Sequence, residues 1–150
     1  MNRKEIKKKL VDLCMQIHQQ TIERLTEEMN EAYQNAAEYG NPEDWLDTYK
    51  MDMLSKRDAC SLKLQKVMDE MKILERINSE KTMDKATFGS VVITETQKLF
   101  IAVGLGKVVV DNETYFVISQ SVPLFHAMKD HKAGEVFMFR DSGEKILEVF

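Results

Sequence analysis

Asp44 and Asp47 are the residues of this chain whose types and spacing best suit chemistry. Residues three apart on a helix share a face, so the two carboxylates can converge on one cation. Magnesium prefers oxygen ligands and is commonly held by one or two carboxylates, with water and substrate oxygens completing the site. A second interpretation is helix capping, because Asn41 is a good N-cap, Pro42 suits the first helical position and acidic residues suit a first turn. The residues alone leave both interpretations open.

Two long helices must position these carboxylates. Up to about Ile77 the only glycine and the only proline lie in the break formed by residues 39–42. On both sides apolar residues recur at steps of three or four, which is typical of a coiled-coil seam. We therefore predict an antiparallel two-helix coiled-coil hairpin over residues 1–82, with Asp44 and Asp47 at its closed tip. Trp45, beside them, either packs against the loop or lies exposed as a contact.

Charge is unevenly distributed along this hairpin. Residues 23–58 contain ten acidic and four basic residues, whereas residues 1–22 and 59–82 together contain ten basic and six acidic ones. This pattern favours an acidic tip that approaches a cationic or metal-containing site, and a base that can contact an anionic partner such as nucleic acid. Chance segregation of charges on exposed helices is the alternative.

Cys14 and Cys60 lie on opposite helices of the hairpin. With the turn near residue 41, residues at the same level should have numbers that sum to about 82, which separates the two thiols by roughly 12 Å along the helices. That distance excludes a disulfide and predicts two buried thiols in a reducing compartment. No transmembrane span or signal peptide is evident, and the three histidines have no ligand spacing for zinc. We expect a cytoplasmic protein.

The second half of the sequence changes to the period of short strands. We expect a small antiparallel sheet over residues 83–150, with one short helix opened by Pro123, so that the whole chain is α+β. The predicted strands are residues 90–96, 98–103, 107–110, 114–119, 135–140 and 145–150.

This order of elements, with the runs Ile118–Leu124 and Lys132–Glu135, resembles the Gre family of bacterial transcript-cleavage factors. The positions that match the family's stretch without gaps are Ile118, Ser119, Pro123, Leu124, Ala127 and Gly134. Val122, Phe125 and Asp130 depart from it. In the family's acidic tip motif, Asp44 aligns with the aspartate, Asp47 with a glutamate and Thr48 with an asparagine.

The resemblance implies an FKBP-like fold for residues 83–150, acting as a docking domain for RNA polymerase. It implies that Trp45, Pro123 and Phe125 contact this partner, with Phe125 on an exposed apolar face. The hairpin would enter the polymerase secondary channel, where Asp44 and Asp47 help hold magnesium and stimulate cleavage of backtracked RNA near its 3′ end. The chain would then be a monomer, no enzyme by itself, without a cofactor of its own when free.

Two alternatives remain from the sequence. The first is a binder of the same channel that alters transcription without stimulating cleavage. The second is a coiled-coil adaptor that binds other proteins and has no part in transcription.

Overall fold

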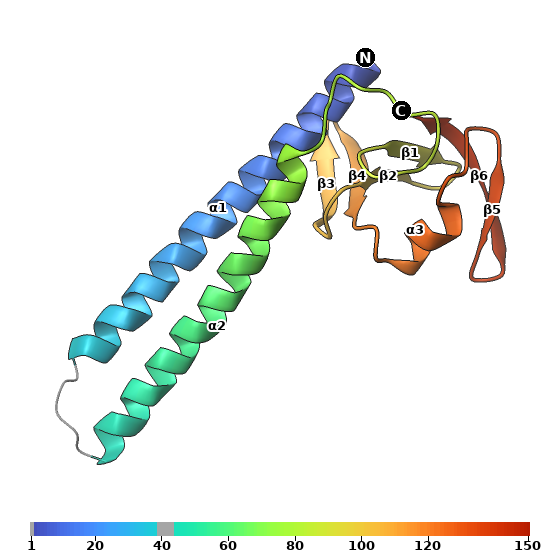
Figure 1. Ribbon diagram of the computed structural model, residues 1–150. Helices are drawn as coiled ribbons and strands as arrows, with labels where there is room; N and C mark the ends of the chain where they lie inside the picture. Colours follow the sequence, from blue (N-terminus) through green and yellow to red (C-terminus); the bar gives the residue numbers. More distant parts are fainter. Residues whose placement is uncertain (1, 39–43) are drawn as a thin grey trace. The chain divides into compact units, whose positions relative to one another are not determined.

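The computed structural model describes residues 2–38 and 44–150, and the side chains of residues 33, 35–38 and 44–50 lie outside that description. Within these residues the chain is α+β, with two long helices followed by a six-stranded sheet and one short helix (Figure 1). The elements are α1 (Arg3–Glu38), α2 (Asp44–Glu75), β1 (Val91–Thr94), β2 (Lys98–Ile101), β3 (Gly106–Val110), β4 (Glu113–Ile118), α3 (Pro123–Met128), β5 (Val136–Phe139) and β6 (Ser142–Val149). No described helix is both long and apolar enough to cross a membrane.

The chain divides into two compact units that do not coincide with the helical and strand-rich halves of the sequence. The sheet unit consists of Met1–Cys14 and Ile73–Phe150, and the helical unit is Met15–Lys72. The first turns of α1 and the end of α2 therefore belong with the sheet. The predicted division at residues 82 and 83 stays a prediction.

In the helical unit, α1 and α2 run side by side in opposite directions (Figure 1). Neither helix contains glycine or proline, so nothing in the sequence interrupts the backbone hydrogen bonds. Leu25 and Ala32 of α1 and Cys60 of α2 are buried, as the predicted seam requires. Knobs-into-holes packing of a coiled coil stays a prediction.

The register of the two helices differs from the prediction. His18 Nε2 lies 2.7 Å from Glu70 Oε2, and Cys60 Sγ lies 3.8 Å from Glu28 Oε2. In both pairs the residue numbers sum to 88, so the predicted sum of about 82 is wrong as a guide to contacts. Helical side chains lean toward the N-terminus of their own helix. In an antiparallel pair, two side chains that touch therefore come from backbone positions that are not at the same level along the helices. The numbers of two such residues have a larger sum than the numbers of two residues at the same level.

The sheet has the strand order β3-β4-β2-β1-β6-β5. The prediction of a purely antiparallel sheet is wrong, because β2 and β4 are parallel neighbours. This pair arises because β4 lies between β2 and its own hairpin partner β3.

The turn into β6 is also displaced from its predicted place, since Arg140 and Asp141 have positive φ values of 51° and 62° and Ser142 already pairs with Phe139. Two such residues suit a type I′ hairpin turn.

One face of the sheet carries the main core together with α3. Phe125 and Met128 of α3 pack there with the buried residues Ala86, Val92, Leu99, Ile101, Phe137, Ile146 and Val149. Phe125 is only 3% exposed, so the expectation that it lies on an exposed apolar face is wrong. A large aromatic side chain on the inner side of a short helix contributes most when it is removed from water.

The opposite face of the sheet is also buried. Val91 pairs with Phe100, which pairs with Val117, so these three side chains share that face, and each is at most 1% exposed.

The first turns of α1 contact the same unit at several points. Arg3 pairs with Glu148 and its guanidinium lies 5.7 Å from the ring centre of Phe150. Lys9 Nζ lies 3.1 Å from Asp111 Oδ2, in the β3–β4 turn. The beginning of α1 is therefore part of the sheet unit's structure.

Candidate functional site

The predicted tip carboxylates lie at the start of α2. Asp44 is the first residue of α2 and Asp47 follows one turn later, so the helical backbone places both on one face. Their side chains, and that of Trp45, lie outside the described residues, as do Asn41 and Pro42 altogether. Among the residues that are described, no group of three or more His, Cys, Asp or Glu side chains could hold a metal ion. The magnesium site therefore stays a prediction.

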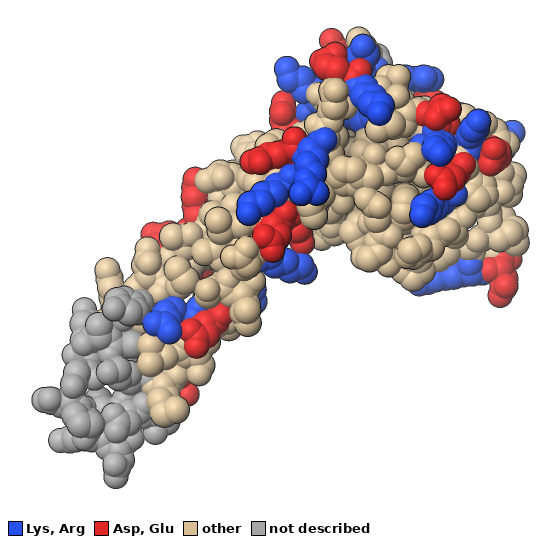
Figure 2. All heavy atoms as spheres, in the orientation of Figure 1, with Lys and Arg blue, Asp and Glu red and all other residues tan. Residues whose placement is uncertain are grey.

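Exposed carboxylates continue along the described part of residues 23–58. Acidic side chains there belong to Glu23, Glu27, Glu28, Glu31, Asp52 and Asp58. Two of them have basic partners on their own helix: Glu28 lies 3.3 Å from Arg24, and Asp58 lies 3.0 Å from Arg57. Figure 2 shows acidic and basic side chains distributed along this part of the helices. Short-range pairing thus offsets part of the negative charge, and the remaining acidic side chains face solvent.

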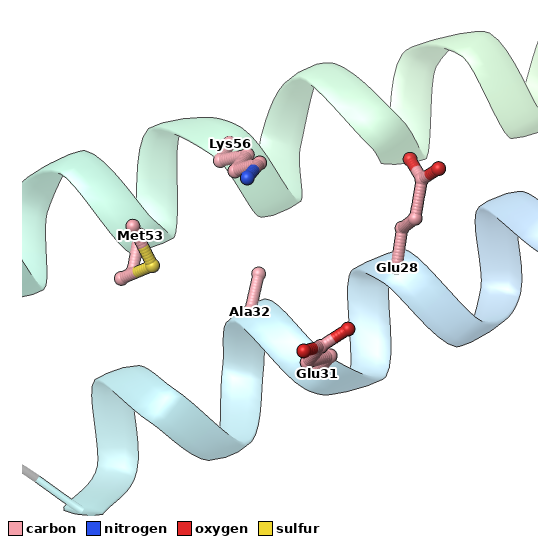
Figure 3. Close-up of a pocket in the computed structure, with 5 residues that line it drawn as sticks. All are labelled: Glu28, Glu31, Ala32, Met53 and Lys56. Carbon is pink, nitrogen blue, oxygen red and sulfur yellow. The ribbon is translucent and has the colours of Figure 1, made fainter.

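A cleft of about 340 Å³ lies between the two helices in this region. Its lining residues are Glu28, Glu31 and Ala32 from α1 and Met53 and Lys56 from α2 (Figure 3). The small side chain of Ala32 leaves the space open, and Glu28 extends toward α2. Two carboxylates beside one ammonium group can bind a cationic side chain, but they include no activated nucleophile. No motif in the sequence points directly to this cleft.

His18 and Glu70 form a buried polar pair that sequence reasoning missed. His18 is 4% exposed, and its Nε2 lies 2.7 Å from Glu70 Oε2. His18 Nδ1 is buried and has no hydrogen-bond partner among the described residues. The pair joins α1 to α2 at one register, because a slip of either helix would leave a polar group buried without a partner. Pairing each polar residue of α1 with the residue of α2 that brings the sum of the two numbers to 88 would have identified His18 and Glu70.

Burial also shifts the pKa of two other groups, in opposite senses for their reactivity. Both cysteines are free and buried, as predicted. Burial raises the pKa of the Cys14 thiol to about 11, so this group is neutral near pH 7 and a poor nucleophile. Burial, followed by the charge of Lys81, lowers the pKa of Lys7 to about 8. Neither group has a catalytic partner beside it among the described residues.

The predicted contact residues of the sheet unit are not together on its surface. Pro123 is exposed at the first position of α3, while Phe125 is in the core. Exposed apolar side chains of the sheet unit are Val109 on β3, Phe116 on β4 and three residues of the β5–β6 hairpin, where Val136, Met138 and Leu147 are 56%, 64% and 53% exposed. Val136 pairs with Lys145 and Met138 with Gly143, so strand alternation places Val136 and Met138 on one face of the hairpin. Leu147 follows Lys145 by two residues, at an irregularity in the pairing of β1 with β6. We call these three residues the hairpin patch.

Comparison with known proteins gives little beyond this geometry. No protein-family model matches the chain, and no curated protein matches it. Among solved structures, it is similar to the crystal structure of GreA factor homolog 1 of Thermus thermophilus, with 16% sequence identity and a TM-score of 0.34. That similarity covers 91% of this chain and 94% of the other.

Proposed function

We propose that this chain is a Gre-like transcription elongation factor whose helical hairpin enters the secondary channel of RNA polymerase and stimulates cleavage of backtracked RNA. The observation that carries the proposal is the combination of the family-like stretch at Ile118–Glu135 with a long two-helix hairpin that has acidic residues at its closed end. The structure supports the proposal through the α+β order of elements. In this proposal the chain is not an enzyme by itself, and hydrolysis belongs to the polymerase.

Asp44 and Asp47 would act as the carboxylate ligands at the tip. Carboxylate oxygens are the donors that magnesium prefers, and their backbone positions share one helical face. Magnesium, when bound there together with polymerase and RNA oxygens, would supply activation of the attacking water. Two carboxylates alone in water make a weak site, so the chain's own contribution is to carry negative charge to the reacting RNA.

The hairpin patch replaces Phe125 as the docking surface of the sheet unit in this proposal. Val136, Met138 and Leu147 form exposed apolar area on a hairpin at the edge of the sheet, with Lys145 on the same face. Apolar groups at the centre of an interface lose water on binding and contribute most of its affinity. Pro123 is exposed and can contribute only at a separate position of the surface.

The experiment that tests the proposal is transcript cleavage in stalled, backtracked elongation complexes with purified polymerase. The unmodified protein should accelerate cleavage, and the Asp44→Asn, Asp47→Asn double variant should lose most of this effect while still binding polymerase. Asparagine keeps the size and much of the capping ability of aspartate, so the double variant tests charge rather than helix stability. Met138→Asp should weaken binding of the full chain, whereas Val109→Asp, at an exposed apolar position of β3 outside the hairpin patch, should not. Equal cleavage by the double variant and the unmodified protein would leave helix capping as the role of both aspartates.

One observation favours the non-cleaving alternative as a second candidate. Asp47 is one methylene shorter than the glutamate of the family motif, and Thr48 stands where an asparagine is usual. A factor with this shape that binds polymerase tightly, yet leaves cleavage at the polymerase's own rate, would be a channel-occupying regulator. A chain that does not co-purify with polymerase would instead be an adaptor outside transcription.

A further inference from the structure

A second concave site lies within the sheet unit and is lined by the segment that follows α2 and by the loop before β1. The cavity has a volume of about 310 Å³, which is within the range of small-molecule sites. Its lining residues are Arg76, Ile77, Asn78, Lys81, Met83, Phe88 and Gly89. All of them belong to one compact unit, and none has been assigned a role above.

The charged groups that line this cavity are both cations. Arg76 and Lys81 have no ion-pair partner among the described residues, and no acidic residue lines the cavity. The nearby Glu80 carboxylate lies 3.9 Å from Lys4 Nζ. A third cation, the buried Lys7, donates a hydrogen bond of 2.8 Å to the carbonyl oxygen of Lys81. The charged side chains that line the cavity are therefore positive in a chain whose net charge is −4.

Local hydrogen bonds hold the backbone that carries the two cations. Arg76 N–H donates to the Ile73 carbonyl at 3.1 Å, which closes the end of α2. Asn78 fixes the next turn, because its carbonyl accepts from Lys81 N–H at 3.2 Å and its Oδ1 accepts from Glu80 N–H at 3.0 Å. Side chains of this kind commonly tie down short turns. Arg76 and Lys81 therefore belong to two turns whose backbones are held by hydrogen bonds.

The rest of the cavity is an apolar wall made by Ile77, Met83 and Phe88, which are all partly buried. Gly89 completes this wall and has φ +84°, a conformation that favours glycine; a Cβ added to it would make ordinary contacts, 3.7 Å from Ile77 and 3.9 Å from Met83. Gly89 N–H donates to the Ile101 carbonyl at 2.7 Å, which joins the wall to the sheet. An apolar wall with one aromatic ring therefore stands beside two cations.

We propose that this cavity binds a nucleotide, with Arg76 and Lys81 holding its phosphates and the wall of Ile77, Met83 and Phe88 contacting its base. Arginine and lysine together provide forked and point-charge donors that suit phosphate oxygens. Every nucleobase has an apolar face that can pack on an aromatic ring. An acidic peptide would satisfy the two cations without using the wall, so a nucleotide fits the lining better. The inference does not depend on polymerase binding.

The test is isothermal titration of the full-length protein with ATP and GTP, without magnesium, and with inorganic tripolyphosphate as the probe for phosphate alone. We expect both nucleotides to bind, and each of Arg76→Ala and Lys81→Ala to weaken binding by about tenfold or more, the effect of losing one charged hydrogen bond. Phe88→Leu should weaken nucleotide binding severalfold and leave tripolyphosphate binding unchanged. Lys72→Ala is the matched control, since Lys72 is an exposed cation on α2 outside the cavity.

Four results with the unmodified protein or the single variants would overturn the inference. They are no nucleotide binding at millimolar concentration, equal affinity for tripolyphosphate and nucleotide, equal weakening by Lys72→Ala and by Arg76→Ala, and tighter binding of a poly-glutamate peptide than of either nucleotide. Circular dichroism of each variant excludes unfolding as the cause of lost binding. Retained affinity for nucleotide in a folded Arg76→Ala, Lys81→Ala double variant would also refute the assignment.

Discussion

Lys7 offers the sharpest test of the sheet unit, because its ammonium group is buried without a carboxylate partner. The residue is 1% exposed, and Nζ donates its hydrogen bond to a neutral carbonyl oxygen, that of Lys81. Burial and, second, the charge of Lys81 lower its pKa from 10.5 to about 8. Other charged groups lie close to it: Arg3, Lys4, Glu5, Lys8 and Lys9 on α1, and Glu80 and Lys81 on the segment that follows α2.

The depressed pKa fixes the sign of the pH dependence. Between pH 8 and pH 10.5 the unfolded chain binds more protons at Lys7 than the folded chain does, so the free energy of unfolding rises with pH in this window. The contribution is fully present above pH 10.5 and is lost as the pH falls through about 8. The whole shift corresponds to about 3 kcal/mol, of which about 2 kcal/mol should be gained between about pH 7 and about pH 9.5.

The perturbation is Lys7→Met, which keeps most of the buried volume and removes the titrating group. The free energy of unfolding, measured by urea denaturation with circular dichroism, should rise by about 2 kcal/mol more in the unmodified protein than in Lys7→Met over this pH range. Other groups that titrate near pH 9.5 are common to both proteins and cancel in the difference. Lys8→Met, at an exposed neighbouring position, should behave as the unmodified protein. The same pH slope in Lys7→Met as in the unmodified protein would refute this reasoning.

Three further predictions follow from burial in the same unit. Phe125→Ala should lower the free energy of unfolding by about 3–5 kcal/mol, measured by urea denaturation, because the ring fills the core; a loss of polymerase binding with unchanged stability would contradict this. Cys14 should resist alkylation by iodoacetamide at pH 8 in the native protein and react after denaturation, as mass spectrometry of its peptide would show; rapid native labelling would contradict its burial. A fragment of residues 84–150 should lose cooperative thermal unfolding and bind a hydrophobic dye, because it lacks the first turns of α1, which belong to the same compact unit; a sharp transition without dye binding would show that α1 is dispensable.

Local sequence patterns account for most of the secondary structure. The apolar spacing and the absence of glycine and proline predicted both long helices, and short runs of β-branched, aromatic and other apolar residues between turns predicted all six strands within a few residues. Pro123 was correctly placed at the start of the short helix. These features depend on the conformational preferences of neighbouring residues, which is why the sequence carries them. The candidate tip carboxylates also came from local spacing, and the structure adds only that α2 begins at Asp44.

The tertiary structure alone decided which elements meet. The insertion of β4 between β2 and β3 creates a parallel pair that no local pattern encodes. The lean of side chains set the contact between His18 and Glu70, and packing of α3 on the sheet took Phe125 out of solvent. Burial of Lys7 likewise needs α1, which starts the chain, to lie against the turn at Lys81. Each of these depends on residues far apart in the sequence, whose pairing is selected by the free energy of the whole core rather than by local preference.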